Sequence, residues 1–297
     1  MSHTLDEIAT QPECWLRAAE AAVEAADALP QPGEDVAVVG CGTSLYMARS
    51  YAVLREEAGH GRTDAFAASQ FPARRRYDRI LALTRSGTTT EVLRLIEEQG
   101  RTGGAATPVT AITADGATPV AAAAGRVVVL PFADERSVVQ TRFATTALAL
   151  LRAHLGEDLG RAVEDARGTL LEPVDPALVA AEQFTFLGDG WTCGLADEAA
   201  LKMREAAGSW TESYPAMEYR HGPISIAAPG RAVWVFGQVP AGLDEDIART
   251  GAALVHSGGL DPLADLIRAQ RLAVARAEAA GLDPDRPRGL TRSVVLG

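Results

Sequence analysis

Residues 36–58 read VAVVGCGTSLYMARSYAVLREEA, and this stretch decides the fold. Its first five residues form a short apolar run, which is typical of a parallel strand buried on both faces. The following turn, 40–44, contains two glycines and two hydroxyl side chains, and the run 45–58 has the pattern of a helix. A buried strand that leads through a tight turn into a helix predicts one βα unit of a parallel sheet.

The same pattern recurs along the chain. Further apolar runs, each ending in a turn, follow in the first half: ILALT (80–84), VTAIT (109–113) and VVVLP (127–131). Helical segments alternate with these runs, which indicates βαβ units and a parallel sheet covered on both faces. The pattern restarts at FTFLG (184–188), so that Gly40 and Gly188 occupy equivalent strand ends, but the second half lacks one or two strands.

These repeats predict an α/β fold with two tandem domains, each a doubly wound, three-layer sandwich around a parallel sheet of flavodoxin-like topology. The second domain is predicted to be shortened. The predicted segments are an N-terminal helical region at 1–33, a first domain at 34–155, a linker at 156–180, a second domain at 181–280 and a tail at 281–297. Within the first segment, 13–29 has the pattern of an amphipathic helix.

Composition limits the classes of partner and compartment. The net charge is −11, whereas a nucleic-acid-binding chain needs a basic face. The run of basic residues at 74–76 is expected to be a solvated loop. Cys14, Cys41 and Cys193 are odd in number and far apart, which favours a reducing cytoplasm and provides no metal framework. No apolar segment suits a membrane span or a signal peptide. The sequence therefore predicts a cytoplasmic protein with no nucleic-acid, membrane or metal partner.

Hydroxyl side chains collect in the turns that follow predicted strands of the first half. They are Thr43 and Ser44, then Thr84, Ser86 and 88–90, and then Ser137 and Thr141. Backbone N–H groups at helix starts bind anions, Gly87 lets the backbone approach one closely, and we expect no carboxylate beside this turn to repel it. The pattern favours a metal-free phosphate site, and the alternative is that these residues are ordinary helix caps.

A nucleotide cofactor is disfavoured by the glycine spacing. Gly188, Gly190 and Gly194 follow a GxGxxxG pattern, and Asp189 would face the pyrophosphate. The sequence GK[ST] of a phosphate-binding P-loop is absent. We therefore expect no cofactor.

Lys202 is the only lysine among 28 basic residues. An ammonium can lose its proton, which a guanidinium does not do, so a chain this rich in arginine makes its one lysine a candidate for chemistry. Glu205 shares its helical face, Glu198 lies one turn before it, and His221 follows in YRHGP. A carboxylate, an amine and an imidazole suit proton transfer next to a carbonyl. The alternative is a Glu–Lys surface pair with a loop histidine, and the residues alone leave both readings open.

Taken together, the motifs resemble those of the sugar isomerase (SIS) domain family. The motifs, in the family's order, are LDEIATQPECW (5–15), GCGTS (40–44), TRSGTTTE (84–91), ERSVVQTRFATT (135–146), FLGDG (186–190), EAALKMRE (198–205), EYRHGP (218–223) and DPDRPRGLTRSV (283–294). The chain looks like the isomerase half of glucosamine–fructose-6-phosphate aminotransferase, and like aminosugar-phosphate deaminases and ketose/aldose-phosphate isomerases. Two tandem SIS domains are therefore expected, and the resemblance implies that the tail at 281–297 lies over the functional site.

The resemblance implies a phosphosugar site and three catalytic roles. By the resemblance, Glu205 moves the proton between C1 and C2, His221 assists ring opening, and Lys202 stabilises the open-chain intermediate. In the family this histidine often reaches into the neighbouring subunit's site, which implies a homodimer with a shared active site. The residues that would line the phosphosugar site are Thr43, Ser44, Thr84, Arg85, Ser86, Thr89 and Val138.

Three departures from the family pattern narrow the choice of reaction that the chain is expected to catalyse. No glutaminase domain and no N-terminal catalytic cysteine precede the matching part, which disfavours glutamine-dependent amino transfer. The tail lysine that forms an imine in the synthases is matched by Arg292, and a guanidinium forms no Schiff base at neutral pH. Arg85 stands where the synthases commonly have a neutral side chain, and we expect it to add a charge-assisted phosphate contact.

We therefore expect an enzyme, either an aldose–ketose isomerase or a deaminase of an aminosugar 6-phosphate, that works through an open-chain enediol-type intermediate. One alternative is a sugar-phosphate sensor without catalysis, although the acidic N-terminus lacks the DNA-binding segment that such regulators usually carry. A second alternative is a deglycase of sugar–amine 6-phosphate conjugates. The sequence does not select the sugar, since this depends on the shape of the pocket.

Overall fold

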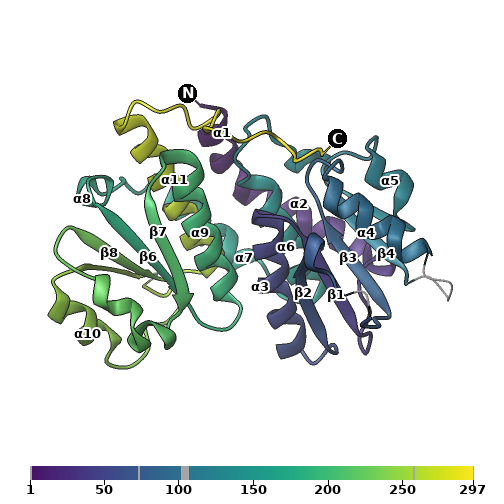
Figure 1. The fold of residues 1–297 in the computed structure, drawn as a ribbon, viewed down its shortest axis with the longest axis horizontal. Helices are drawn as coiled ribbons and strands as arrows, with labels where there is room; N and C mark the ends of the chain where they lie inside the picture. The colour runs from purple at the N-terminus through teal and green to yellow at the C-terminus, as the bar shows by residue number, and fades with distance from the viewer. Residues whose placement is uncertain (1, 73, 102–106, 257, 297) are drawn as a thin grey trace. The chain divides into compact units, whose positions relative to one another are not determined.

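The structure is a computed structural model that describes residues 2–72, 74–101, 107–256 and 258–296. The chain forms two compact units, and each contains a parallel sheet (Figure 1). Unit 1 consists of Met1–Pro12, Arg136–Thr141 and Gly160–Leu290. Unit 2 consists of Glu13–Glu135, Arg142–Leu159 and Thr291–Gly297.

Within the described residues, unit 2 has a five-stranded sheet of order β2-β1-β3-β4-β5, with every pair parallel. Its strands are β1 (Val36–Gly40), β2 (Thr63–Ala67), β3 (Arg79–Leu83), β4 (Val109–Thr113) and β5 (Arg126–Val129). Every residue of β1, β3 and β4 is buried, which explains their unbroken apolar sequences. This strand order is the flavodoxin-like one, and it changes direction between β1 and β3.

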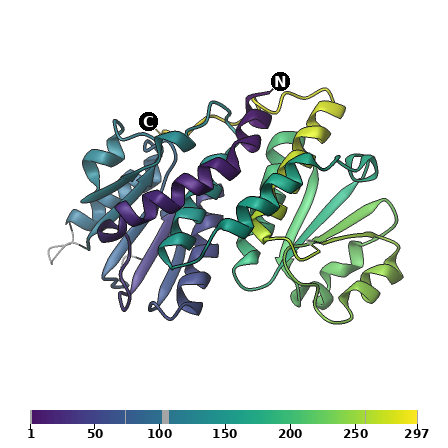
Figure 2. The ribbon, with the colours of Figure 1, turned by 180° about the vertical axis from the view of Figure 1, so that it is seen from behind.

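Helices cover both faces of this sheet (Figures 1 and 2). They are α2 (Gln11–Glu24), α3 (Thr43–Glu57), α4 (Thr90–Arg101), α5 (Pro119–Ala123) and α6 (Arg142–His154). The β1–α3–β2 and β3–α4–β4 crossovers run in opposite directions along the sheet, so the common right-handed connection sends α3 and α4 to opposite faces. Alternate residues Ala37 and Val39 accordingly pack with Val92 and Leu95 of α4.

Unit 1 has a four-stranded parallel sheet of order β7-β6-β8-β9 among the described residues. Its strands are β6 (Gln183–Gly188), β7 (Trp210–Pro215), β8 (Arg231–Val235) and β9 (Ala253–His256). Its helices are α1 (His3–Ala9), α7 (Gly160–Leu171), α8 (Pro176–Val179), α9 (Thr192–Ala207), α10 (Leu243–Thr250) and α11 (Pro262–Ala279). The order matches the first four strands of the other sheet, so among the described residues this sheet has no counterpart of the edge strand β5.

The predicted α/β class with parallel sheets is confirmed, and most central elements match their predicted ranges. Two edge strands, β2 and β7, were not predicted. Their sequences, TDAFA and WTESYP, are mostly half-buried or exposed, so neither has the apolar run that reveals a central strand. The N-terminal helix was predicted at 13–29, but α2 ends at Glu24 and a short 3₁₀ turn, Ala26–Ala28, follows.

The equivalence of Gly40 and Gly188 has a physical basis. A Cβ atom on Gly40 would lie 2.7 Å from the backbone carbonyl carbon of Ser44, and one on Gly188 would lie 2.4 Å from that of Thr192. Both glycines thus let the following helix start directly against the end of its strand. The turn after β1, which carries Thr43 and Ser44 of the candidate site, depends on this close approach.

We predict that Gly188→Ala lowers the free energy of unfolding by about 1–3 kcal/mol, which is the usual cost of forcing extra atoms into a packed site. The atoms nearest to the new Cβ belong to the backbone, which cannot move aside as a flexible side chain can. Gly168, within α7, is the matched control, since a Cβ there meets nothing within 4 Å. Gly168→Ala should raise stability by about 0.5–1 kcal/mol through helix propensity. Chemical denaturation of both variants measures the difference, and equal stabilities would contradict the close-approach explanation.

Candidate functional site

The hydroxyl-rich turns of unit 2 follow β1 and β3, the two neighbouring strands between which the strand order changes direction. Ligands of doubly wound sheets bind at the carboxyl ends of the strands at this position. Thr43 and Ser44 are the first two residues of α3, so the N–H groups at the start of this helix lie in the turn. Gly42, which precedes them, has a φ of 55°. The first predicted turn therefore presents N–H groups of the kind that bind anions, and the phosphate site itself stays a prediction.

The turn after β3 is also closely organised. The Ser86 hydroxyl accepts hydrogen bonds from the Thr88 amide at 3.3 Å and from the Thr88 hydroxyl at 3.1 Å. Gly87 has a φ of 62°, and a Cβ atom there would overlap the Thr118 side chain. The buried Thr84 hydroxyl has no hydrogen-bond partner among the described residues. A buried hydroxyl without a partner is the kind of group that a bound ligand would satisfy.

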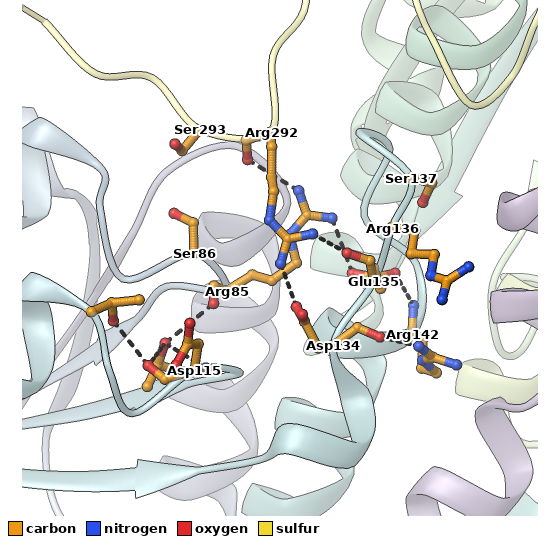
Figure 3. A network of polar contacts seen from close by, with 12 residues as sticks. Arg85, Ser86, Asp115, Asp134, Glu135, Arg136, Ser137, Arg142, Arg292 and Ser293 are labelled. Carbon is orange, nitrogen blue, oxygen red and sulfur yellow. Dashed lines mark hydrogen bonds and ion pairs between the residues drawn. The ribbon is translucent and has the colours of Figure 1, made fainter.

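Arg85 is buried, and its guanidinium faces a carboxylate of the chain itself (Figure 3). It lies 3.2 Å from the carboxylate of Glu135, which is also fully buried, and it donates a hydrogen bond of 3.0 Å to the backbone carbonyl of Arg292. Glu135 in turn accepts the amide N–H of Arg142, the first residue of α6, at 2.7 Å. The expectation of no carboxylate beside this turn was therefore wrong, although Arg85 balances its charge. A phosphate contact from Arg85 stays a prediction.

The last part of the tail lies along the turn after β3. Arg292 contacts the carboxylate of Asp134 and the backbone carbonyl of Glu135 (Figure 3). A hydrogen bond of 2.9 Å joins the hydroxyls of Thr88 and Ser293, and the Thr90 amide donates to the carbonyl of Val294 at 3.1 Å. Arg292 is thus held beside the predicted phosphate turn of the same unit, and its match to an imine-forming lysine stays a prediction.

In unit 1, Lys202 lies on α9 and is only 1% exposed. Its ammonium contacts the carboxylate of Glu205 and lies 3.4 Å from that of Glu198, which is equally buried. The alternative of a surface Glu–Lys pair is therefore wrong. A buried ammonium needs such partners, because removing it from water without compensation is costly. Glu205 is 18% exposed, so of these three side chains it alone reaches solvent.

The other predicted residues of unit 1, His221 and Val138, lie on other segments of the unit. His221 ends a 3₁₀ turn (Glu218–His221), is exposed, and makes no hydrogen bond with the described part of the chain. Val138 is half-buried in a loop whose neighbour Ser137 is held by Glu7 of α1. The Glu7 carboxylate also accepts the amide of Ser137 at 3.3 Å.

Glu7, Glu135 and Glu198 are buried carboxylates that were not among the predicted site residues. Glu198 had a sequence signal, since it lies four residues before Lys202. Glu7 and Glu135 had none beyond their places in the family motifs, because their partners are distant in sequence.

Two thiols near the strand ends have raised pKa values, which disfavours a role as nucleophile. Burial raises the pKa of Cys41, and burial together with the nearby carboxylates of Asp189 and Asp197 raises the pKa of Cys193 to about 11. Both thiols are therefore protonated near neutral pH, and a thiol is a far weaker nucleophile than a thiolate.

We predict that Glu135→Gln destabilises the protein by about 3–5 kcal/mol, because removing one partner leaves the other charge buried and uncompensated. Arg85→Gln should have a similar effect, and the double variant should lose much less than the sum of the two. Chemical denaturation of the three variants gives the coupling free energy. Arg94→Gln, which removes an exposed arginine of α4, is the control for loss of a surface charge. Additive effects would mean that the pair does not act as a unit.

Comparisons with known proteins agree with the motifs. No protein-family model matches the chain. The glutamine–fructose-6-phosphate aminotransferase of Xanthomonas campestris is 27% identical, with 98% of this chain and 58% of the relative covered. That of Sulfurisphaera tokodaii is 26% identical, with 89% and 50% covered. The chain thus spans about half the length of the curated relatives it matches.

Solved structures share the fold over almost the whole chain. Glucosamine-6-phosphate deaminase of Thermotoga maritima has a TM-score of 0.83 at 25% identity, with 99% of this chain and 100% of that chain covered. Tagatose-6-phosphate ketose/aldose isomerase of Escherichia coli has a TM-score of 0.84 at 18% identity, with 99% and 96% covered, and at this identity shows the fold alone. The resemblance is confirmed: the chain is related in sequence to glutamine–fructose-6-phosphate aminotransferases and shares its fold with phosphosugar isomerases and glucosamine-6-phosphate deaminase.

Proposed function

We propose that the chain is an enzyme that isomerises a hexose 6-phosphate or deaminates an aminohexose 6-phosphate through an open-chain enediol-type intermediate. The observation that supports this most strongly is Lys202, buried between Glu198 and Glu205, with only Glu205 reaching solvent. The partly exposed carboxylate of Glu205 provides a base, and the ammonium of Lys202 provides a fixed positive charge beside it. Transfer of a carbon-bound proton needs both, because negative charge develops on the substrate oxygen as the proton leaves.

In the proposed chemistry, Glu205 removes the proton from one of the carbons C1 and C2 and returns it to the other. The ammonium of Lys202 stabilises the negative charge that develops on the oxygen of the intermediate. His221 moves the oxygen-bound proton during ring opening. For an amino substrate, the proton transfer gives an imine at C2, to which water adds before ammonia leaves. The three side chains supply base, acid and cation without a cofactor.

The phosphate is proposed to bind at the turns that follow β1 and β3. Their helix starts and the unsatisfied hydroxyl of Thr84 support this assignment. A bound phosphate would share Arg85 and Arg292 with the carboxylates that they already contact. The proposed phosphosugar-binding residues are Thr43, Ser44, Thr84, Arg85, Ser86, Thr89, Val138 and Arg292.

Further parts of the proposal concern assembly and location. We infer two tandem SIS domains, which the two similar strand orders support. We also infer a homodimer in which His221 serves the partner's site. This is supported by its exposure and by the lack of a hydrogen bond to the described part of the chain. Among the described residues no helix is long and apolar enough to cross a membrane. The unpaired thiols of Cys14, Cys41 and Cys193 support a cytoplasmic location.

We predict that Glu205→Gln lowers kcat by about 10²–10⁴-fold, the usual contribution of a general base, while sugar-phosphate binding persists. A thermal-shift screen of hexose and aminohexose 6-phosphates identifies the ligand. Ammonia release and solvent-deuterium exchange at C2 then follow turnover. Glu245→Gln, which changes an exposed glutamate of α10, is the matched control. Near wild-type turnover in Glu205→Gln would exclude Glu205 as the proton shuttle, and bound ligands without exchange in the wild type would favour a sensor.

We predict that Lys202→Arg lowers kcat at least about tenfold, although it keeps the positive charge. The larger guanidinium would overpack the closed site around residue 202, which usually costs about 1–3 kcal/mol and displaces the neighbouring groups. Lys202→Met, which keeps the length but removes the charge, should lower kcat further. Circular dichroism checks that both variants fold. Full activity of Lys202→Arg would mean that the single lysine has no chemical role.

A further inference from the structure

The turn that carries His221 has few restraints of its own. It is a 3₁₀ turn of four residues, Glu218–His221, and no side chain of the described chain caps its start. Hydrogen bonds in a 3₁₀ turn have poorer geometry than those of an α-helix, so the position of such a turn depends on its surroundings. Gly222, which follows His221, has a φ of 132°. A glycine leaves the backbone on that side of His221 more freedom than any other residue would.

The two residues before His221 are both attached to α10. Tyr219 is fully buried, in an apolar cluster that also contains Ile247 of this helix. Arg220 is 26% exposed, and its Nε donates a hydrogen bond of 2.5 Å to the carboxylate of Asp246. An apolar contact and an ion pair thus hold the turn on α10, and His221 itself is left exposed.

The guanidinium of Arg220 is held at two further points. It donates a hydrogen bond of 2.9 Å to the carbonyl of Ala241, just before α10, and one of 3.6 Å to the sulfur of Met217. A planar guanidinium with its donors in a fixed fork joins such separate acceptors, which an ammonium does less well. The hydrogen bond from Arg220 is the main cause that holds the pKa of Asp246 below its usual range, so the pair is charged at neutral pH.

The same carboxylate is contacted by a second arginine, which lies outside the turn. Arg249 follows Asp246 by three residues on α10, and its side chain is 69% exposed. An exposed ion pair within one helix contributes little to stability. Arg220 and Arg249 thus share one carboxylate, but only Arg220 belongs to the turn that carries His221.

The attachment of this turn matters for the chemistry of the imidazole. On the proposed function, on which this inference rests, His221 moves the oxygen-bound proton during ring opening. A group that transfers a proton must lie within hydrogen-bond reach of the atom it serves, and a displacement of about 1 Å can lower a rate by about 100-fold. We propose that Arg220 and Asp246 are positioning residues, which act through His221 by fixing its turn against α10. Loss of the pair then slows the chemical step and leaves the affinity for the sugar phosphate nearly unchanged.

The kinetic test follows ammonia release from glucosamine 6-phosphate and exchange of solvent deuterium into fructose 6-phosphate. We expect Arg220→Gln and Asp246→Asn to lower kcat at least about tenfold while KM stays nearly unchanged. Arg220→Lys, which keeps the charge, should recover part of kcat. Arg249→Gln is the matched control and should leave both constants as in the wild type. Wild-type kcat in Arg220→Gln and Asp246→Asn would overturn the inference and leave the proposed function standing.

A double-variant cycle with His221→Gln separates positioning from a general structural effect. If the pair acts through His221, adding Arg220→Gln to His221→Gln should lower kcat no further. Losses that multiply in the double variant would overturn the inference, because the pair would then affect turnover by another route. Circular dichroism checks that the variants fold, as we expect, since a partly exposed ion pair contributes little to global stability.

Hydrogen–deuterium exchange of the amides in segment 217–224 tests the hold on the turn without any turnover. We expect faster exchange in Arg220→Gln and Asp246→Asn, and wild-type exchange in Arg249→Gln. If the wild-type protein turns over neither sugar phosphate, the proposed function fails for these substrates and exchange decides the inference. Faster exchange confined to the two pair variants would then support the role of the pair in fixing His221. Unchanged exchange in both would overturn the inference, whatever the activity.

Discussion

Burial of the Lys202 ammonium is the constraint on which the candidate chemistry depends. A charge that is 1% exposed needs compensation from nearby opposite charges, and two carboxylates on the same helix supply it. Glu198 is itself buried, so it serves to hold the lysine, whereas Glu205 retains access to solvent. The two carboxylates thus differ in exposure. Glu198 is a structural partner of the lysine, whereas Glu205 is able to exchange protons with a ligand.

In unit 2, a buried guanidinium is likewise compensated by a buried carboxylate. The buried Arg85–Glu135 pair also anchors the tail, since Arg85 donates to the carbonyl of Arg292 and Glu135 accepts the first amide of α6. A planar guanidinium with several donors connects such separate acceptors, which an ammonium does less well. The turn after β3, the start of α6 and the tail are thereby tied into one network. The tail residues near a predicted phosphate turn are thus positioned by the same charges that stabilise the turn.

The sequence predicted the central elements well but missed two edge strands. β1, β3, β4 and β6 are buried along their whole length, so their apolar sequences identify them without reference to the rest of the chain. β2 and β7 were missed because their residues are mostly half-buried or exposed, so neither edge strand has the apolar run by which a buried strand is identified. Among the site residues, the Lys202–Glu205 contact followed from helical spacing. The carboxylate facing Arg85 did not, because Glu135 is 50 residues away.

The sequence by itself determined the α/β class, the strand ends at Gly40 and Gly188, the hydroxyl turns and the helix that bears Lys202. Each of these depends on local periodicity or on a glycine that admits a close approach. Only the tertiary structure decided that Lys202 is buried and that the charge of Arg85 is balanced by the carboxylate of Glu135. The physical reason is that desolvation and charge pairing depend on which distant segments pack together, and no local pattern specifies that.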